Sequence, residues 1–254
     1  MSDIDKNTEE CHDENGVDLD VMRKISEHPC YNKDAQHKYG RIHLAVAPKC
    51  NIQCNYCDRK FDCVNESRPG VTSEVLTPQE ALEKTRQVLK DYPFIKVVAV
   101  AGPGDPLAND ETFEALELIK NEFPEVTLCL STNGLALPDR IDDLLRVGVS
   151  TLTVTLNAID PEIQAQIVDH IAYKGKSYKG VEAAEILIKN QLEGIRLAVE
   201  AGMVVKINTV LIPTINRDHI VEVAKKVREL GVFIMNIMPL ICQAKFADME
   251  PPTN

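Results

Sequence analysis

From Arg41 onward, the chain alternates short runs of strand character with longer segments of helical periodicity. The apolar, β-branched runs predict six strands, at 41–48, 95–101, 125–131, 149–157, 203–211 and 232–238. Helices are predicted to begin at Thr77 and Asn109 and to cover 138–147, 159–171, 180–201 and 216–230. Strict alternation of this kind produces right-handed βαβ units and a parallel sheet. Six strands are too few for a closed (β/α)8 barrel, so the sheet is either an open barrel or doubly wound.

The side-chain pattern along the strands favours the open barrel. The run STLTVTLN, residues 150–157, alternates threonine or asparagine with leucine or valine, so one face of the strand is polar and the other apolar. His43 and Cys129 lie on the corresponding faces of two other predicted strands. Doubly wound sheets are apolar on both faces. We therefore predict an α/β fold, a partial open (β/α)6 TIM-like barrel whose inner face lines a cavity.

Charge and apolar content set the domain organisation and exclude several classes of partner. Residues 1–27 are acidic and poor in large apolar side chains, which predicts a flexible N-terminal arm before a core domain at 28–254. The net charge of -11 disfavours a nucleic-acid surface, and a small molecule or a protein is the expected partner. No apolar run is long enough to span a membrane, and the start of the chain has no apolar signal segment, so a cytoplasmic protein is expected.

Four of the eight cysteines lie within fourteen residues, in the run CNIQCNYCDRKFDC. Cys50 comes just after the first predicted strand, at the carboxyl end where parallel barrels place their chemistry. Thiolates suit zinc or iron-sulfur clusters. All four thiolates, those of Cys50, Cys54, Cys57 and Cys63, would suit a tetrahedral zinc ion, whereas the C-x3-C-x2-C spacing of the first three favours a cluster with one open iron.

The C-x3-C-x2-C motif after the first strand resembles that of the radical S-adenosylmethionine (SAM) superfamily. The resemblance implies that Cys50, Cys54 and Cys57 hold a [4Fe-4S] cluster whose open iron binds SAM, and that an electron from the cluster cleaves SAM to a 5'-deoxyadenosyl radical. Polar residues and glycines at the ends of later strands agree in kind with the SAM contacts of that superfamily. The candidates are Gly102, Gly104, Asp105, Ser131, Asn133, Asn157 and Asn208.

A longer block, His28 to Glu74, and the later NIMPLI run resemble those of the superfamily members that build the nitrogenase cofactor. This resemblance implies two further [4Fe-4S] clusters as substrates, which are fused around a SAM-derived carbide into an [8Fe-9S-C] precursor. It implies Cys30, His43 and Cys129 as ligands of the first substrate cluster and Cys63 as a ligand of the second. The expected protein partners are an iron-sulfur donor, an electron donor such as ferredoxin, and a scaffold or carrier that accepts the product.

Side chains near Cys63 have roles that the sequence alone leaves open. Glu66 is expected to act as a temporary ligand or a proton carrier, although a solvated loop carboxylate fits equally well. Basic residues of the same loop would offset cluster charge or simply face water; they are Arg59, Lys60 and Arg68. Cys11 and Cys242 receive no role.

The sequence leaves open both the second substrate site and the type of protein. Related nitrogenase-cofactor proteins carry a C-terminal C-x2-C that is not found before Asn254, so the second substrate site is expected to be incomplete and the protein to be a short, stand-alone form. A non-catalytic carrier of clusters or zinc would use the same thiols without needing the strand-end motifs. A radical SAM enzyme acting on a peptide or a small molecule would not need Cys30, His43, Cys129 or Cys63.

Overall fold

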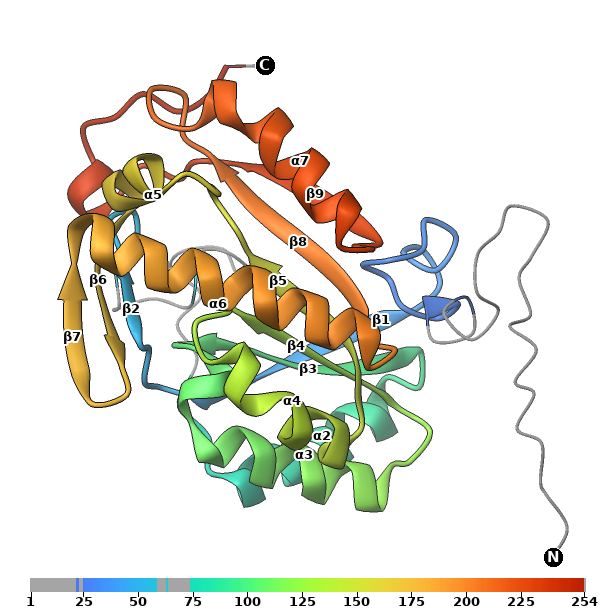
Figure 1. Ribbon diagram of the computed structural model, residues 1–254. Helices are drawn as coiled ribbons and strands as arrows, with labels where there is room; N and C mark the ends of the chain where they lie inside the picture. The colour runs from blue at the N-terminus through green and yellow to red at the C-terminus, as the bar shows by residue number, and fades with distance from the viewer. Residues whose placement is uncertain (1–21, 23–24, 59–62, 64–73, 254) are drawn as a thin grey trace, which may run out of the picture.

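A computed structural model describes residues 22, 25–58, 63 and 74–253. Its main sheet has six parallel strands in the order β1-β3-β4-β5-β8-β9. The strands are β1 (Gly40–Ala47), β3 (Ile95–Pro103), β4 (Thr127–Thr132), β5 (Val149–Thr155), β8 (Val204–Leu211) and β9 (Ile234–Pro239). They curve into a partial barrel in which β1 and β9 form the two edges, and this confirms the predicted open α/β barrel (Figure 1).

Helices connect these strands and cover the outside of the sheet (Figure 1). They are α2 (Pro78–Asp91), α3 (Asp110–Glu122), α4 (Leu137–Val147), α5 (Pro161–Ile167), α6 (Gly180–Glu200) and α7 (Ile220–Glu229), with short 3-10 turns η1 (Pro106–Ala108), η2 (Arg217–His219) and η3 (Ala244–Phe246). The start predicted at Thr77 is confirmed, because its hydroxyl accepts the Glu80 N–H at 3.2 Å while the Glu80 carboxylate accepts the Thr77 N–H at 2.8 Å. Asn109 also precedes its helix, but its side chain bonds Lys49 instead of capping α3.

The two faces of the strands differ as their alternation predicts. Leu152, Val154 and Leu156 are fully buried in the main hydrophobic core, which lies between the sheet and the helices. Thr151 and Thr153 point to the inner face and are also buried. The inner face of β5 is therefore polar, whereas its outer face packs in the apolar core.

A second, three-stranded antiparallel sheet has the order β2-β6-β7 and was not predicted. It consists of β2 (Ile52–Cys54), β6 (Val168–Tyr173) and β7 (Lys176–Lys179). The helix expected over 159–171 is wrong in its last part, because α5 ends at Ile167 and the chain then pairs with β2. This sheet lies beside the carboxyl ends of the barrel strands (Figure 1).

The start of the described chain packs against the barrel. Ile25 and Tyr31 are buried in a small cluster with Val204 of β8. Packing therefore reaches residue 25, and most of the predicted N-terminal arm lies outside the described residues.

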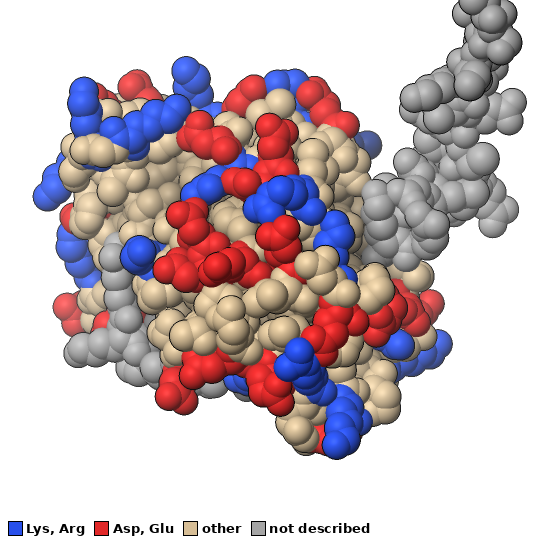
Figure 2. Space-filling model, turned by 90° about the horizontal axis from the view of Figure 1, so that it is seen from below, with Lys and Arg blue, Asp and Glu red and all other residues tan. Residues whose placement is uncertain are grey.

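The outer surface over α2, α3 and α4 carries interspersed positive and negative side chains (Figure 2). No helix in the described part of the chain has the length and apolar character needed to cross a membrane.

Candidate functional site

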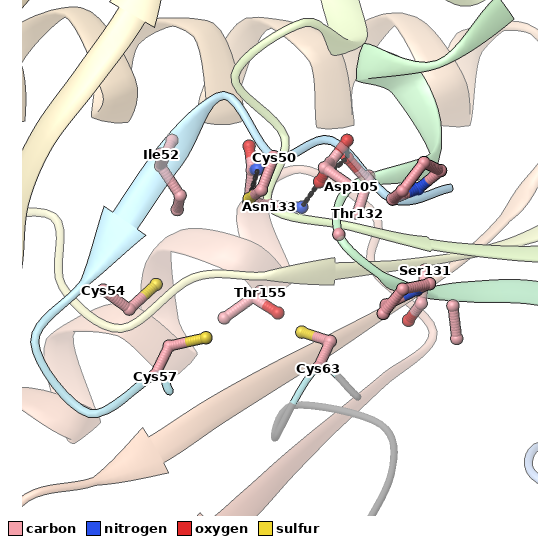
Figure 3. A pocket seen from close by; sticks show the side chains of 14 residues that line it. Cys50, Ile52, Cys54, Cys57, Cys63, Asp105, Ser131, Thr132, Asn133 and Thr155 are labelled. Carbon is pink, nitrogen blue, oxygen red and sulfur yellow. Dashed lines mark hydrogen bonds between the residues drawn. The ribbon is translucent and has the colours of Figure 1, made fainter. Parts of the chain in front are cut away.

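A cavity of about 700 Å3, part of it open to solvent, lies at the carboxyl ends of the barrel strands. It brings together the cysteine loop after β1 and the ends of β3, β4 and β5. Its lining comprises Pro48, Cys50, Ile52, Cys54, Cys57, Cys63, Ala101, Pro103, Gly104, Asp105, Ser131, Thr132, Asn133 and Thr155. The sulfur atoms of Cys54 and Cys57 face that of Cys63 across this space, and Cys50 lies beside Asn133 (Figure 3). We call this space the cysteine cavity.

The cysteine loop is held in place by its own short strand. Cys54 ends β2 and is buried, and its partner across the ladder is Val168 of β6. Burial, followed by the neighbouring thiols of Cys57, Cys50 and Cys63, raises the pKa of the Cys54 thiol. Without a bound metal the group therefore stays protonated at neutral pH, and metal binding must displace that proton.

The donor set consists of cysteine thiols, which suit an iron-sulfur cluster. No three His, Cys, Asp or Glu side chains within residues 22, 25–58, 63 and 74–253 meet closely enough to hold a single ion. A tetrahedral zinc site needs such convergence, whereas the thiolates of a cluster bind different iron atoms and lie further apart. The thiols of Cys50, Cys54, Cys57 and Cys63 all line one cavity, an arrangement that suits a cluster.

The end of β3 approaches the cysteine loop so closely that only glycine fits at one position. A Cβ on Gly104 would lie 2.2 Å from the carbonyl oxygen of Lys49 and 2.9 Å from that of Ala47. The Gly104 N–H donates to that Ala47 oxygen at 2.5 Å. Gly102 is less confined, since its nearest atom would be the backbone nitrogen of Cys63 at 3.5 Å. The Gly-rich turn thus joins the first strand end, the second strand end and Cys63.

Asp105 lines the cavity but its carboxylate is used to join two strand ends. It accepts the Leu107 N–H at 3.0 Å, the Thr132 hydroxyl at 2.9 Å and the Asn133 N–H at 2.6 Å. Burial raises its pKa to about 6, against the opposing effect of these hydrogen bonds. Through these contacts Asp105 joins the turn after β3 to the end of β4, and its contact with SAM stays a prediction.

Asn133 links the end of β4 to the cysteine loop. Its Nδ2 donates to Asn51 Oδ1 at 2.7 Å and to Cys50 Sγ at 3.8 Å. Ser131 lies on the same strand and lines the same cavity. Both predicted residues are therefore brought to the cysteines.

Asn157 and Asn208 are buried but are not among the residues that line this cavity. Asn157 donates to the Tyr56 hydroxyl at 2.8 Å and accepts the Val210 N–H at 2.8 Å. Asn208 Oδ1 accepts from Asn236 at 3.4 Å. Their observed contacts hold the cysteine loop and the neighbouring strands in place.

A second, smaller cavity of about 250 Å3, part of it open to solvent, lies between β1, β3, β4, β5 and β8 and contains the other predicted ligands. Its lining comprises Cys30, Arg41, His43, Ala99, Ala101, Cys129, Leu130, Ser131, Thr153 and Lys206. We call it the inner cavity. Burial, followed by the charges of Arg41 and Lys206, lowers the pKa of His43 to about 4. The imidazole is therefore neutral at physiological pH and keeps a nitrogen lone pair available for a metal.

The two cavities share part of their walls. Ala101 of β3 and Ser131 of β4 line both. The structure therefore places Cys30, His43 and Cys129 next to the cysteine cavity, on the far side of two small side chains.

Two residues near the site were missed by the sequence analysis. Tyr56 is 1% exposed and contacts Asn157 from within the cysteine loop. Lys206 is 4% exposed and lines the inner cavity. A lysine at the centre of an apolar strand was the available signal for Lys206, since lysine is seldom buried without a partner.

Several predicted residues cannot be placed in either cavity. Glu66, Arg59, Lys60, Arg68 and Cys11 lie outside the described residues. Cys242 packs at the edge of the smaller hydrophobic core and lines neither cavity.

Comparison with known proteins identifies the family. Residues 44–227 match the radical SAM superfamily. The chain is 48% identical to the FeMo cofactor biosynthesis protein NifB of Methanocaldococcus infernus, over 92% of this chain and 79% of that protein. It is 55% identical to the protein of the same name from Klebsiella pneumoniae and 52% to that from Bradyrhizobium diazoefficiens, each over 88% of this chain.

The matches differ in the share of each protein that they cover and in sequence identity. The chain spans 48% of the Klebsiella protein and 45% of the Bradyrhizobium protein, or about half of each. Among solved structures, anSMEcpe with bound AdoMet covers 80% of this chain with a TM-score of 0.56 and 16% identity, and the chain covers 52% of it. Streptococcus suis SuiB covers 89% with a TM-score of 0.55 and 15% identity, and the chain covers 46% of it. These two share the fold, and the chain itself belongs to the radical SAM superfamily and, within it, to the NifB family of FeMo cofactor biosynthesis proteins.

Proposed function

We propose that the protein is a radical SAM enzyme that methylates and fuses two [4Fe-4S] substrate clusters and inserts a SAM-derived carbide, forming the [8Fe-9S-C] precursor of the nitrogenase cofactor. The observation that carries the proposal is the shared wall of the two cavities, formed by Ala101 and Ser131. Chemistry on a cluster requires the SAM site and the cluster site to be adjacent, because a methyl group and a radical must both reach the same substrate.

In the cysteine cavity, Cys50, Cys54 and Cys57 would hold the resident [4Fe-4S] cluster, with SAM on its open iron. When bound, the cluster and SAM would supply a methyl group from one SAM molecule and a 5'-deoxyadenosyl radical from a second SAM molecule. Pro103, Gly104 and Asn133 line the cavity and would form the wall that faces SAM, whereas Gly102 is not among the lining residues. Asp105 fixes that wall by joining the ends of β3 and β4.

In the inner cavity, Cys30, His43 and Cys129 would hold the first substrate cluster. A neutral imidazole is a weaker cluster ligand than a thiolate, so His43 would be the ligand most easily released when the cluster moves or rearranges. Cys63 lies across the cysteine cavity from Cys54 and Cys57 and would bind the second substrate cluster (Figure 3). Glu66 remains a prediction as a temporary ligand or proton carrier.

The first test is product analysis after anaerobic reconstitution with iron and sulfide, followed by dithionite and SAM. Formation of both S-adenosylhomocysteine and 5'-deoxyadenosine would support methyl transfer and radical cleavage at one site. Deoxyadenosine alone would favour a radical enzyme with a peptide or small-molecule substrate. Absence of both products, with iron retained, would favour a non-catalytic carrier.

Matched cysteine variants localise the activity. Cys54→Ala should abolish both products, because the cluster that binds SAM loses a ligand. Cys129→Ala should abolish S-adenosylhomocysteine while the protein still cleaves SAM to deoxyadenosine. Cys242→Ala is the control, since Cys242 lines neither cavity, and it should retain both products. Full methyl transfer by Cys129→Ala would contradict the assignment of the inner cavity.

A further inference from the structure

The inner cavity is lined by two positively charged side chains, Arg41 and Lys206, which are not among the proposed cluster ligands. Lys206 is in the first half of β8 and is 4% exposed. Arg41 of β1 lines the same cavity from its more exposed side, and its guanidinium donates to Cys30 Sγ. Among the described residues, those that line the cavity include no aspartate or glutamate.

Lys206 makes no ion pair with any residue in the described part of the chain. Its Nζ lies 5.5 Å from the centre of the Tyr31 ring, and Tyr31 is fixed by a hydrogen bond from its hydroxyl to the Leu152 carbonyl at 3.0 Å. An aromatic ring stabilises a cation that lies over its face. This stabilisation is weaker than the one that a carboxylate would give. A buried ammonium without an opposite charge is costly, and such groups are normally paired. The structure therefore keeps a cation next to a cavity whose described lining residues include no carboxylate.

An iron-sulfur cluster bound by thiolates would supply that anion. Its sulfides and cysteine thiolates carry negative charge, and one-electron reduction adds one further negative charge to the cluster. A fixed cation beside the cluster stabilises the reduced form more than the oxidised form, and so raises the reduction potential. Nearby positive charge also opposes dissociation of an anionic cluster.

We infer that Lys206, assisted by Arg41, is the counter-ion of the inner cavity, which retains the substrate cluster bound by Cys30, His43 and Cys129 and sets its reduction potential. The inference rests on the proposed function, because it requires a cluster in this cavity. Lys206 is a positioning residue, since it acts on the cluster through charge and contributes no ligand atom to it.

The test uses the full chain carrying Cys50→Ala, Cys54→Ala and Cys57→Ala, so that the SAM-binding cluster contributes no signal. In this parent protein, Lys206→Met removes the charge at similar side-chain length, and Lys206→Arg keeps the charge. Lys226→Met is the matched control, because Lys226 lies on α7 outside the inner cavity and, within the described part of the chain, forms its ion pair with Glu229. Each protein is reconstituted with iron and sulfide, desalted, and analysed for iron content and for reduction potential by dithionite titration followed by electron paramagnetic resonance.

We expect Lys206→Met to retain less iron than the parent and to show a more negative reduction potential. Lys206→Arg should restore both values, and Lys226→Met should match the parent. If Lys206→Met does not fold, Arg41→Gln takes its place, because Arg41 is exposed; it should shift both values in the same direction by a smaller amount.

The possible failures are distinguishable. A parent protein that binds no cluster would overturn the assignment of Cys30, His43 and Cys129, and the inference with it. A parent that binds a cluster whose iron content and potential are unchanged in Lys206→Met would overturn the counter-ion role alone. The proposed function would then stand.

Discussion

Asp105 Oδ2 accepts the backbone N–H of Asn133 at 2.6 Å, and this bond ties the turn after β3 to the end of β4. The same carboxylate accepts the Thr132 hydroxyl and the Leu107 N–H. Three buried donors from two segments thus depend on one side chain. The wall of the cysteine cavity is therefore organised by a residue that need not touch the substrate.

Replacing Asp105 by alanine should destabilise the protein substantially. Asp105→Ala leaves buried donors of Leu107, Thr132 and Asn133 without an acceptor, and each unsatisfied group costs about 1–3 kcal/mol. We expect a loss of at least about 3 kcal/mol in the free energy of unfolding, which urea denaturation would measure. Asp105→Asn keeps an acceptor oxygen and should lose less. Equal stability of Asp105→Ala and the wild type would show that these bonds are replaced by water.

The raised pKa of Asp105 predicts a pH dependence of stability. The folded carboxyl has a pKa of about 6, above its usual value of 3.8, so between these values the folded state binds more protons than the unfolded state. Stability from this group is therefore present below about pH 4 and is lost as the pH rises through 6, by on the order of 3 kcal/mol. Asp105→Asn cannot titrate, so the gap between the two proteins should change over this window. Parallel stability curves from pH 4 to 7 would count against the shift.

Gly104→Ala should distort the cysteine loop, because the new Cβ would clash with two backbone carbonyls, those of Lys49 and Ala47. We expect a loss of about 2–3 kcal/mol in stability and reduced iron binding after reconstitution. Gly102→Ala, two residues earlier, meets its nearest atom at an ordinary 3.5 Å and should cost less than about 1 kcal/mol. If both variants behave alike, the close approach at Gly104 does not position the loop.

The barrel could be predicted from the sequence because its signals are local. Period-two alternation in 149–157 and helix start signals such as Thr77 and Glu80 do not depend on distant contacts. The β6 strand could not be predicted in this way. Ile163, Ile167 and Ile171 are spaced four apart, as on a helix, and only pairing with β2 across the fold turns the segment into a strand.

The site was predictable where residues follow strand ends and less so where contacts decide their use. Cys50 and Ser131 were found by position alone, and both line the cysteine cavity. Asn157 was expected to contact SAM, which stays a prediction; the structure shows its hydrogen bonds to Tyr56 and Val210. Lys206 was not predicted as a site residue, because a strand pattern shows to which face a side chain points but not whether it forms an ion pair.

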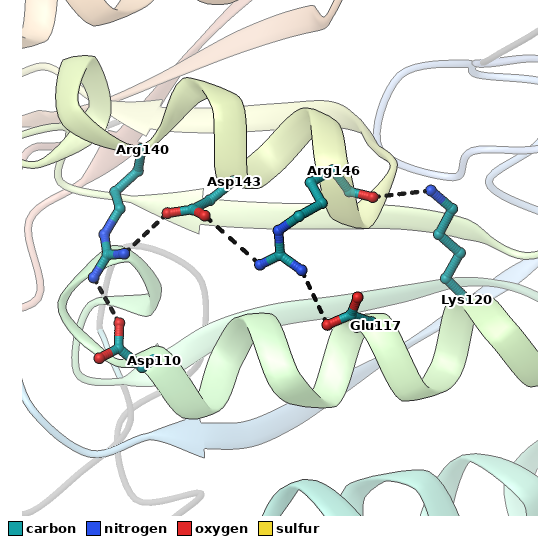
Figure 4. Close-up of polar contacts among 6 residues, drawn as sticks. All are labelled: Asp110, Glu117, Lys120, Arg140, Asp143 and Arg146. Carbon is teal, nitrogen blue, oxygen red and sulfur yellow. Dashed lines mark hydrogen bonds and ion pairs between the residues drawn. The ribbon is translucent and has the colours of Figure 1, made fainter.

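An ion-pair network joins α3 to α4 on the surface (Figure 4). Arg146 lies 3.0 Å from Glu117 and is 48% exposed, whereas Arg140 contacts Asp110 and Asp143 at 31% exposure and stacks over Phe113. Arg146→Ala should cost less than about 1 kcal/mol and the effect should disappear in high salt. Arg140→Ala should cost about 1–2 kcal/mol, part of which persists in salt because of the ring contact. Denaturation at two salt concentrations separates the cases, and equal salt sensitivity would contradict the Phe113 contribution.

Ile171 connects the unpredicted sheet to the cysteine loop. It is fully buried, pairs with Ile52 of β2 and packs in the same core cluster as Cys54 and Tyr56. Ile171→Ala should cost about 2–5 kcal/mol through the cavity it leaves. Because β2 then loses its support, iron binding should fall even under conditions in which the variant is still folded, that is, at denaturant concentrations below its unfolding midpoint. Ala172→Ser, on the exposed face of the same strand, is the matched control and should change neither stability nor iron content. Normal iron binding by a destabilised Ile171→Ala would mean that the cysteine loop is held by the barrel alone, without help from β6.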